Sequence, residues 1–215
     1  MAKKLFGRKV LTADNVELSA ENVGKILNKV IPLHLQNKAD IEYLCDFYRG
    51  DQPALDRPKE IRPEIKNTVI ENRALEIVEF KKGYEFSHPI QYTNAGLKQN
   101  APVNKLNDYA RLDSKEAKDL SLSEYFFKCG TSYRIVLPNL IESPDEAPYV
   151  TDVLDPKDTF VVYSNEIGNK RALLAGTYVI RGEGNQKRYI CEVYTKKEHF
   201  TWEMKSTHMS SNLQL

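Results

Sequence analysis

The sequence predicts an α+β fold in which helices come first and strands follow. Between residues 19 and 130, apolar side chains recur every three or four positions, the spacing that gives a helix one buried face. From residue 131 to 205, short runs rich in β-branched and aromatic residues alternate with turn residues. Because these runs follow one another without helical segments between them, we expect an antiparallel meander rather than parallel βαβ units.

Four segments are expected along the chain. Residues 1–18, rich in lysine and arginine, are expected to form a flexible basic arm. Residues 19–130 are expected to form a mainly helical part, and residues 131–205 an antiparallel β part. The polar residues 206–215 are expected to fray.

Two helices are predicted before residue 51. The first begins after Ser19, a good N-cap, and ends at Pro32, which cannot donate the backbone hydrogen bond that continues a helix. Asn37 is predicted to cap the second. That helix ends near Tyr48, because Gly50 follows where a left-handed backbone favours glycine.

A loop and further elements follow. Residues 51–66 contain three prolines and a run of charged residues, so we expect an exposed loop. Thr68 and Glu71 have the spacing of a capping box, which predicts a third helix ending near Gly83. Two more helices are predicted at about residues 103–112 and 114–130. The predicted strands are residues 131–137, 149–154, 159–163, 172–181, 188–194 and 199–204.

The composition is that of an ordinary globular protein. With Lys+Arg 31 against Asp+Glu 30, the net charge of +1 gives no sign of a large nucleic-acid footprint. Cys45, Cys129 and Cys191 are odd in number and form no CxxC motif, so we expect reduced, buried thiols in a cytosolic protein. No apolar run approaches the roughly 20 residues that span a bilayer, so no membrane partner is expected.

No arrangement of side chains indicates catalysis, a cofactor or a metal. The four histidines lack the spacing of a metal-binding helix, and the sequence has no phosphate-binding glycine loop. One alternative is a Mg²⁺-dependent nuclease, in which Glu203 and Lys205 would act with Asp152 or Asp155. Another is a DNA-binding module, because basic residues gather locally and twelve tyrosines offer stacking faces.

Short motifs between Ile41 and Met204 occur in a fixed order. The first group is Tyr43-Leu44, Tyr48-x-Gly50, Pro63-Glu64-Ile65-Lys66-Asn67, Asn72-Arg73-Ala74, Ile77-Val78-Glu79, Gly83-Tyr84 and Pro89-Ile90-x-Tyr92. The second group is Gly130-Thr131-Ser132-Tyr133, Pro156 with Phe160-Val161-Val162-Tyr163, and Glu192-Val193-Tyr194-Thr195. With these motifs the chain resembles the N-terminal half of tailed-bacteriophage portal proteins, of the type found in siphophages of Gram-positive bacteria. It departs from them at Ser87, where glycine is usual, and near Glu79, where the family favours aspartate.

The resemblance implies a structural role and the fold of the portal wing domain. Portal chains normally continue through a stem, a clip and a crown, so the sequence is expected to represent the N-terminal wing alone. Portal proteins form a dodecameric ring at one capsid vertex, contact the major capsid protein, dock terminase and head-completion proteins, and pass double-stranded DNA through their channel. The resemblance thus implies a virion protein that assembles in the cytoplasm of the infected bacterium, is not an enzyme and uses no cofactor.

Two surfaces are predicted to contact neighbouring subunits or the capsid shell, because charge lies beside proline-stiffened backbone there. One is the loop Asp51–Lys66 and the other is the edge around Lys81 and Pro89. The predicted contact residues are Arg57, Lys59 and Arg62 on the loop, and Lys81, Lys82 and His88 on the edge. The motif residues expected to form the supporting scaffold are Tyr48, Gly50, Asn72, Gly83, Tyr84, Pro89, Ile90 and Tyr92.

Overall fold

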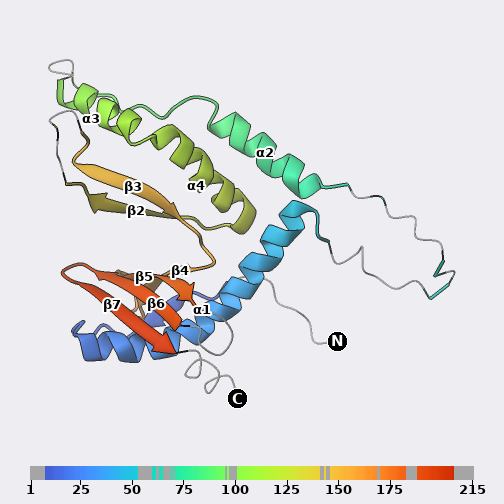
Figure 1. Ribbon diagram of the computed structural model, residues 1–215, viewed down its shortest axis with the longest axis horizontal. Coiled ribbons are helices and arrows are strands. Elements are labelled where there is room, and N and C mark those ends of the chain that lie inside the picture. The colour runs from blue at the N-terminus through green and yellow to red at the C-terminus, as the bar shows by residue number, and fades with distance from the viewer. Residues whose placement is uncertain are drawn as a thin grey trace. The chain divides into compact units, whose positions relative to one another are not determined.

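The computed structural model confirms the α+β class (Figure 1). It describes residues 8–52, 60–61, 63–64, 69, 71–94, 96, 101–140, 143, 146–168, 170–182 and 188–205. The helices are α1 (Ala20–Arg49), α2 (Arg73–Glu85), α3 (Ala101–Leu112) and α4 (Lys115–Cys129). The strands are β1 (Leu11–Ala13), β2 (Tyr133–Pro138), β3 (Tyr149–Leu154), β4 (Thr159–Ser164), β5 (Ala172–Arg181), β6 (Arg188–Thr195) and β7 (His199–Lys205).

The strands form two sheets. The larger has the order β1-β4-β5-β6-β7, and within it β4 to β7 form the predicted antiparallel meander. The strands β2 and β3 pair antiparallel with each other in a separate two-stranded sheet. Every predicted strand is present. The described residues that connect strands of the meander, 165–168 between β4 and β5 and 196–198 between β6 and β7, are not helical, as the spacing of the turn residues indicated.

The start of the chain differs from the expected flexible arm. Residues 11–13 form β1, which lies parallel to β4 with Leu11 opposite Val162. The Leu11 side chain is only 5% exposed and belongs to the main hydrophobic core. A strand of three residues is too short to show an alternating pattern, so no periodicity of the residues predicts it.

The helix α1 is continuous through Pro32, so the prediction of two separate helices was wrong. An interior proline removes one helical hydrogen bond, but it does not stop a helix whose buried face continues beyond it. The buried face here does continue, through His34 (2% exposed) and Asn37 (7% exposed) to Ile41. An apolar pattern cannot find this continuity, because two of its members are polar.

Asn37 is therefore not a helix cap. Its side chain pairs with the backbone of Lys9, because the Lys9 N–H donates to Asn37 Oδ1 at 2.9 Å and Asn37 Nδ2 donates to the Lys9 carbonyl at 2.9 Å. These two bonds satisfy a buried amide and hold the segment that precedes β1 against the helix.

The chain packs as two compact units, and the change from helices to strands near residue 130 is not their boundary. The sheet unit comprises residues 1–42 and 156–215, and the helical unit comprises residues 43–155. The five-stranded sheet and the first part of α1 belong to the sheet unit. The helices α2 to α4 and the β2–β3 sheet belong to the helical unit, as does the end of α1. None of the described helices is long and apolar enough to cross a lipid bilayer.

The core of the sheet unit depends on two close approaches that only glycine permits. A Cβ atom added to Gly24 in α1 would lie 2.7 Å from the Trp202 ring, and one added to Gly176 in β5 would lie 2.5 Å from Phe160 Cζ. Both aromatic rings therefore lie directly on the backbone of these residues, where any side chain would exclude them.

His34 is a buried histidine in this core. Its Nε2 lies 3.1 Å from the carbonyl oxygen of Lys157, which can only accept, so Nε2 carries the proton. The ring also packs against Phe160 and Tyr178, at centroid distances of 5.1 Å and 5.6 Å. Burial lowers the pKa of His34 to about 4, and the Lys157 carbonyl and nearby Asp158 only partly oppose that effect.

We expect His34 to make the sheet unit sensitive to acid. The unfolded chain takes up a proton at this residue below about pH 6.5, whereas the folded chain does so only below about pH 4, so stability is lost as the pH falls between these values. At about pH 5 the expected loss is about 2 kcal/mol. His34→Gln keeps an N–H donor but does not titrate, so its urea-unfolding midpoint should fall less between about pH 7.5 and pH 5. An equal fall in both proteins would contradict this account.

Candidate interaction site

The motif residues at the end of α1 and the start of α2 hold these two helix ends together. Asn72 caps α2, because its Oδ1 accepts a hydrogen bond from the Leu75 N–H at 3.1 Å. The same side chain donates through Nδ2 to the carbonyl of Tyr48 at 2.7 Å. Gly50 has a φ of +97°, which lets the chain turn sharply after α1. The predicted capping box was wrong, since α2 begins at Arg73, and Thr68 lies outside the described residues.

Lys82 lies within a network of ion pairs rather than on the open surface. Its ammonium donates to Glu79 at 2.7 Å and to Glu124 of α4 at 3.3 Å, and its side chain is 20% exposed. The hydroxyl of Tyr48 donates to the same Glu79 oxygen at 2.7 Å. Hydrogen bonds from Lys82 and Tyr48 hold the pKa of the Glu79 carboxyl below its ordinary value. We call these residues, with Lys128, the Tyr48 network.

Lys128 completes the Tyr48 network from α4. Its ammonium lies 4.9 Å from the centroid of the Tyr48 ring and 4.9 Å from that of Tyr125, and it donates to Glu124 at 3.2 Å. Burial raises the pKa of Tyr48, and the bond to Glu79 adds to this, so the phenol stays protonated as a donor. The network thus connects α1, α2 and α4 and fixes which side of α2 faces outward.

The opposite side of α2 is apolar and exposed. Ile77, Phe80 and Tyr84 are 56%, 71% and 79% exposed, and their spacing places them on one face of the helix. The rings of Phe80 and Tyr84 stack with a centroid distance of 6.2 Å. Lys81 is exposed beside them, with its ammonium 5.7 Å from the centroid of the Phe127 ring. We call Ile77, Phe80, Lys81 and Tyr84 the α2 outer face. An exposed cluster of this kind is typical of an interaction surface.

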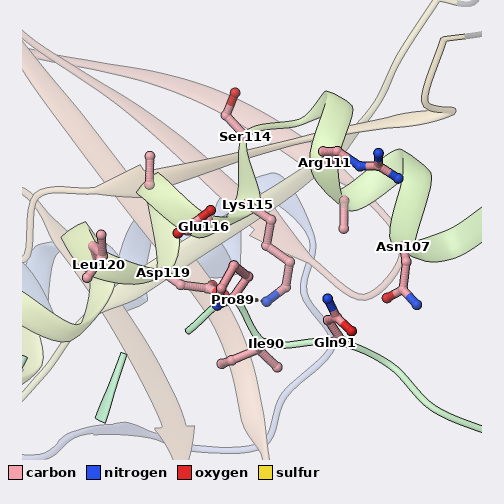
Figure 2. A pocket seen from close by; sticks show the side chains of 12 residues that line it. Pro89, Ile90, Gln91, Asn107, Arg111, Ser114, Lys115, Glu116, Asp119 and Leu120 are labelled. Atoms are coloured by element: carbon pink, nitrogen blue, oxygen red, sulfur yellow. Dashed lines mark hydrogen bonds and ion pairs between the residues drawn. The ribbon is translucent and has the colours of Figure 1, made fainter. Parts of the chain in front are cut away.

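A second candidate feature is a groove of about 770 Å³ lined by the Pro89–Gln91 segment and by residues of α3 and α4. Figure 2 shows the Lys115 side chain reaching from α4 toward the segment that carries Pro89 and Ile90. Ile90 is 51% exposed, so its side chain is open to a partner. We call this feature the Pro89 groove. Its further lining residues are Asn107, Ala110, Arg111, Ser114, Glu116, Ala117, Asp119 and Leu120.

Tyr92 anchors the segment that forms one wall of the Pro89 groove. Its N–H donates to Asn107 Oδ1 at 2.9 Å, and its carbonyl accepts from Asn107 Nδ2 at 3.0 Å. The amide of Asn107 thus takes the place of a neighbouring strand. The Tyr92 ring lies 5.7 Å from the Lys115 ammonium. The motif residues Pro89, Ile90 and Tyr92 therefore have a defined structural place beside α3 and α4.

Buried carboxylates hold the rest of the helical unit in place. Asp119 of α4 accepts hydrogen bonds from Lys115 and from Arg134 of β2. Asp113 accepts from the N–H of Thr151 at 3.1 Å and from Lys118 at 2.6 Å. Burial alone would raise the pKa of both carboxyls, but the hydrogen bonds from their partners outweigh it and lower the pKa.

The predicted contact residues therefore differ in their exposure and in their partners. Lys81 and His88 are exposed, whereas Lys82 supports α2 from within. Arg57, Lys59 and Arg62 lie outside the described residues. None of the apolar side chains of the α2 outer face was predicted to contact a partner. Tyr84 was predicted only as part of the supporting scaffold. The sequence signal for this face was the helical spacing of Ile77, Phe80 and Tyr84. Apolar residues at that spacing usually form the buried face of a helix, so the spacing does not indicate an exposed one.

The carboxylates proposed for a nuclease site, Glu203 and Asp152, have the following surroundings in the structure. Glu203 accepts a hydrogen bond from Arg188 at 3.1 Å, and Asp152 lies exposed on β3. Within the described part of the chain, no three His, Cys, Asp or Glu side chains are grouped in a way that could hold a metal ion.

A family model described as "Phage portal protein, SPP1 Gp6-like" matches residues 27–214, which contain the α2 outer face and the Pro89 groove. No curated protein matches the chain.

Proposed function

Since the chain belongs to the SPP1 Gp6-like family of phage portal proteins, we propose that it is a subunit of the portal ring in which the α2 outer face contacts a neighbouring subunit or the capsid shell. The family is a structural component of the bacteriophage virion at the head–tail connection, and it is not enzymatic. That role favours a structural protein over the nuclease and DNA-binding alternatives. The match over residues 27–214 is the observation that carries the proposal.

The proposed partners follow from the role of a portal. They are further copies of this chain in a dodecameric ring, the major capsid protein around that ring, and the terminase and head-completion proteins. Double-stranded DNA would pass through the channel. Assembly would take place in the cytoplasm of the infected bacterium, before the ring becomes part of the virion.

The α2 outer face fits a protein partner better than it fits DNA. Three of its four side chains are apolar or aromatic, and aromatic side chains are enriched at the centres of protein interfaces. Lys81 is its one cation, too little for a surface that binds phosphate backbones. The Tyr48 network keeps α2 fixed from behind, so the face is rigid before a partner arrives and little ordering is required on binding.

The Pro89 groove, with exposed Ile90 and His88, extends the proposed contact surface. Pro89 has no backbone N–H, and Tyr92 is fixed by Asn107, so this segment also presents a rigid surface. We propose that it receives part of the same neighbouring protein. The loop residues Arg57, Lys59 and Arg62 remain proposed contacts on the strength of the sequence alone.

The double substitution of Phe80→Ser and Tyr84→Ser should reduce ring formation at least about tenfold without unfolding the chain. Each side chain is more than two-thirds exposed, so the folded state loses little when it is shortened, whereas an interface loses two central aromatic contacts. Sedimentation velocity of the purified protein, and counts of DNA-filled heads in cells that supply only the variant, would measure the effect.

Ile167→Ser is the matched control, since it removes a fully exposed apolar side chain from a turn of the sheet unit. Far-ultraviolet circular dichroism checks that both variants remain folded. Ring formation by the Phe80/Tyr84 variant at the level of the Ile167 control would refute the assignment of this face.

A further inference from the structure

Two cysteines that are far apart in sequence lie side by side in the helical unit. Cys45 is in the last part of α1, Cys129 is the last residue of α4, and 84 positions separate them. Their sulfur atoms are 3.6 Å apart, and the residues are 7% and 3% exposed. A disulfide requires the two sulfur atoms to approach by only about another 1.5 Å.

The surrounding contacts show that this proximity follows from the packing of two helix ends. Tyr48, one helical turn after Cys45, lies under the ammonium of Lys128, which is the neighbour of Cys129. Gly130 follows Cys129 with a φ of 67° and donates its N–H to the Phe126 carbonyl at 2.7 Å, so the end of α4 is closed by a well-formed cap. The same register that brings Tyr48 to Lys128 brings Cys45 to Cys129.

We propose that Cys45 and Cys129 are a redox pair, a dithiol in reducing surroundings that low-molecular-weight disulfides convert to an intramolecular disulfide. In the first step, the thiolate of one cysteine attacks a sulfur of the external disulfide, forms a mixed disulfide and releases one thiolate. In the second step, the other cysteine gives up its proton and attacks the protein sulfur of that mixed disulfide, which releases the second thiolate. Both cysteines are oxidised, and one external disulfide is reduced to two thiols.

The bond would tie the last part of α1 to the end of α4. Because it closes a loop of 84 positions, it restricts the unfolded chain strongly, and it stabilises the packing that supports the Tyr48 network. Since both thiols are buried, the exchange must wait for local opening of these helix ends, so we expect it to be slow.

The setting in which the bond would form depends on the proposed function, although its chemistry does not. A virion component passes from the reducing cytoplasm of its host to the outside of the cell, where disulfides persist. The pair would therefore be open during assembly and closed in released particles. A chain that forms no rings could still show the chemistry, so the two proposals fail separately.

The test is incubation of the reduced full chain with glutathione disulfide, followed by denaturation, blocking of free thiols and peptide mapping. We expect a cross-linked peptide pair that contains Cys45 and Cys129 and has lost two hydrogens, while Cys191 remains free. The oxidised chain should also unfold at a temperature higher by on the order of 5 °C, and a dithiol reductant should reverse this change.

Cys191→Ala is the matched control, because it removes a buried thiol from the sheet unit and should leave the cross-link intact. Cys129→Ala should lose both the cross-linked peptide and the oxidation-dependent rise in unfolding temperature. The proposal is overturned if all three thiols of the wild-type chain stay free, or if they carry only glutathione adducts. Mapping of the wild-type chain decides this even where a variant folds poorly.

Discussion

Asp119→Ala is expected to destabilise the helical unit by about 3–5 kcal/mol. The Asp119 side chain is 8% exposed, and its carboxylate accepts hydrogen bonds from both Lys115 and Arg134. Its removal leaves two cations that are themselves mostly buried, with no compensating charge between them. The loss of a charge partner, rather than the loss of packing, accounts for the size of the effect.

Urea unfolding at neutral pH measures this loss as a lower midpoint at an unchanged slope. Asp108→Ala is the matched control, because Asp108 of α3 is also paired with an arginine, Arg111 of the same helix, but its side chain is 60% exposed. An exposed pair of this kind contributes at most about 1 kcal/mol. If the two substitutions cost the same, burial of the Asp119 ion pairs does not make their loss more costly than the loss of an exposed pair.

The same substitution has a consequence for the proposed interaction surface. Lys115, one partner of Asp119, also lies over the Tyr92 ring, and both Lys115 and Asp119 line the Pro89 groove. Releasing Lys115 should therefore loosen the wall of that groove before the unit unfolds. The stability of the helical unit and the geometry of the Pro89 groove therefore both depend on the Asp119 carboxylate.

Local signals in the sequence predicted most of the elements of this fold. The β-branched runs that became β4, β5 and β6 are short and separated by clear turn residues, so nothing in the tertiary structure needed to override them. Gly50 was placed correctly after its helix, and the helix predicted to end at Gly130 does end there, because a left-handed residue at a helix end is a local requirement.

The predictions of secondary structure were wrong where tertiary packing outweighed the local preference of the residues. Pro32 is a strong local signal for a helix end, yet the helix continues because His34 and Asn37 extend its buried face and find backbone partners in distant segments. Those partners, Lys157 and Lys9, cannot be inferred from the residues near the helix. Residues 11–13 became a strand for a similar reason, since β4 supplies the edge with which they pair.

The candidate site could be predicted only in part. The motifs around Tyr48, Asn72 and Tyr92 marked the segments that are fixed in place, because their roles depend on local turns and caps. Which side of α2 faces outward depends on Lys82 meeting Glu124 from another helix, and sequence spacing does not give that contact. The proximity of Cys45 and Cys129 depends on the same packing.

Gly176→Ala is expected to destabilise the sheet unit by about 3 kcal/mol, near the upper end of the range for overpacking a core. The new methyl group would lie 2.5 Å from Phe160 Cζ, closer than two carbon atoms can approach. The Phe160 ring is 1% exposed and packs against His34, so it has little room to move away. Urea unfolding of the full chain measures the change.

A double-mutant cycle separates this clash from the general cost of a side chain in the middle of β5. Phe160→Leu alone should cost about 1 kcal/mol, since it shortens a fully buried ring. If the clash is responsible, Gly176→Ala should cost at least about 1 kcal/mol less in the Phe160→Leu background than in the wild-type chain. If the costs of Gly176→Ala and Phe160→Leu simply add, the glycine is required by the backbone of β5 and not by the Phe160 ring. In that case the close approach of Phe160 would be a consequence of Gly176 rather than the reason for it.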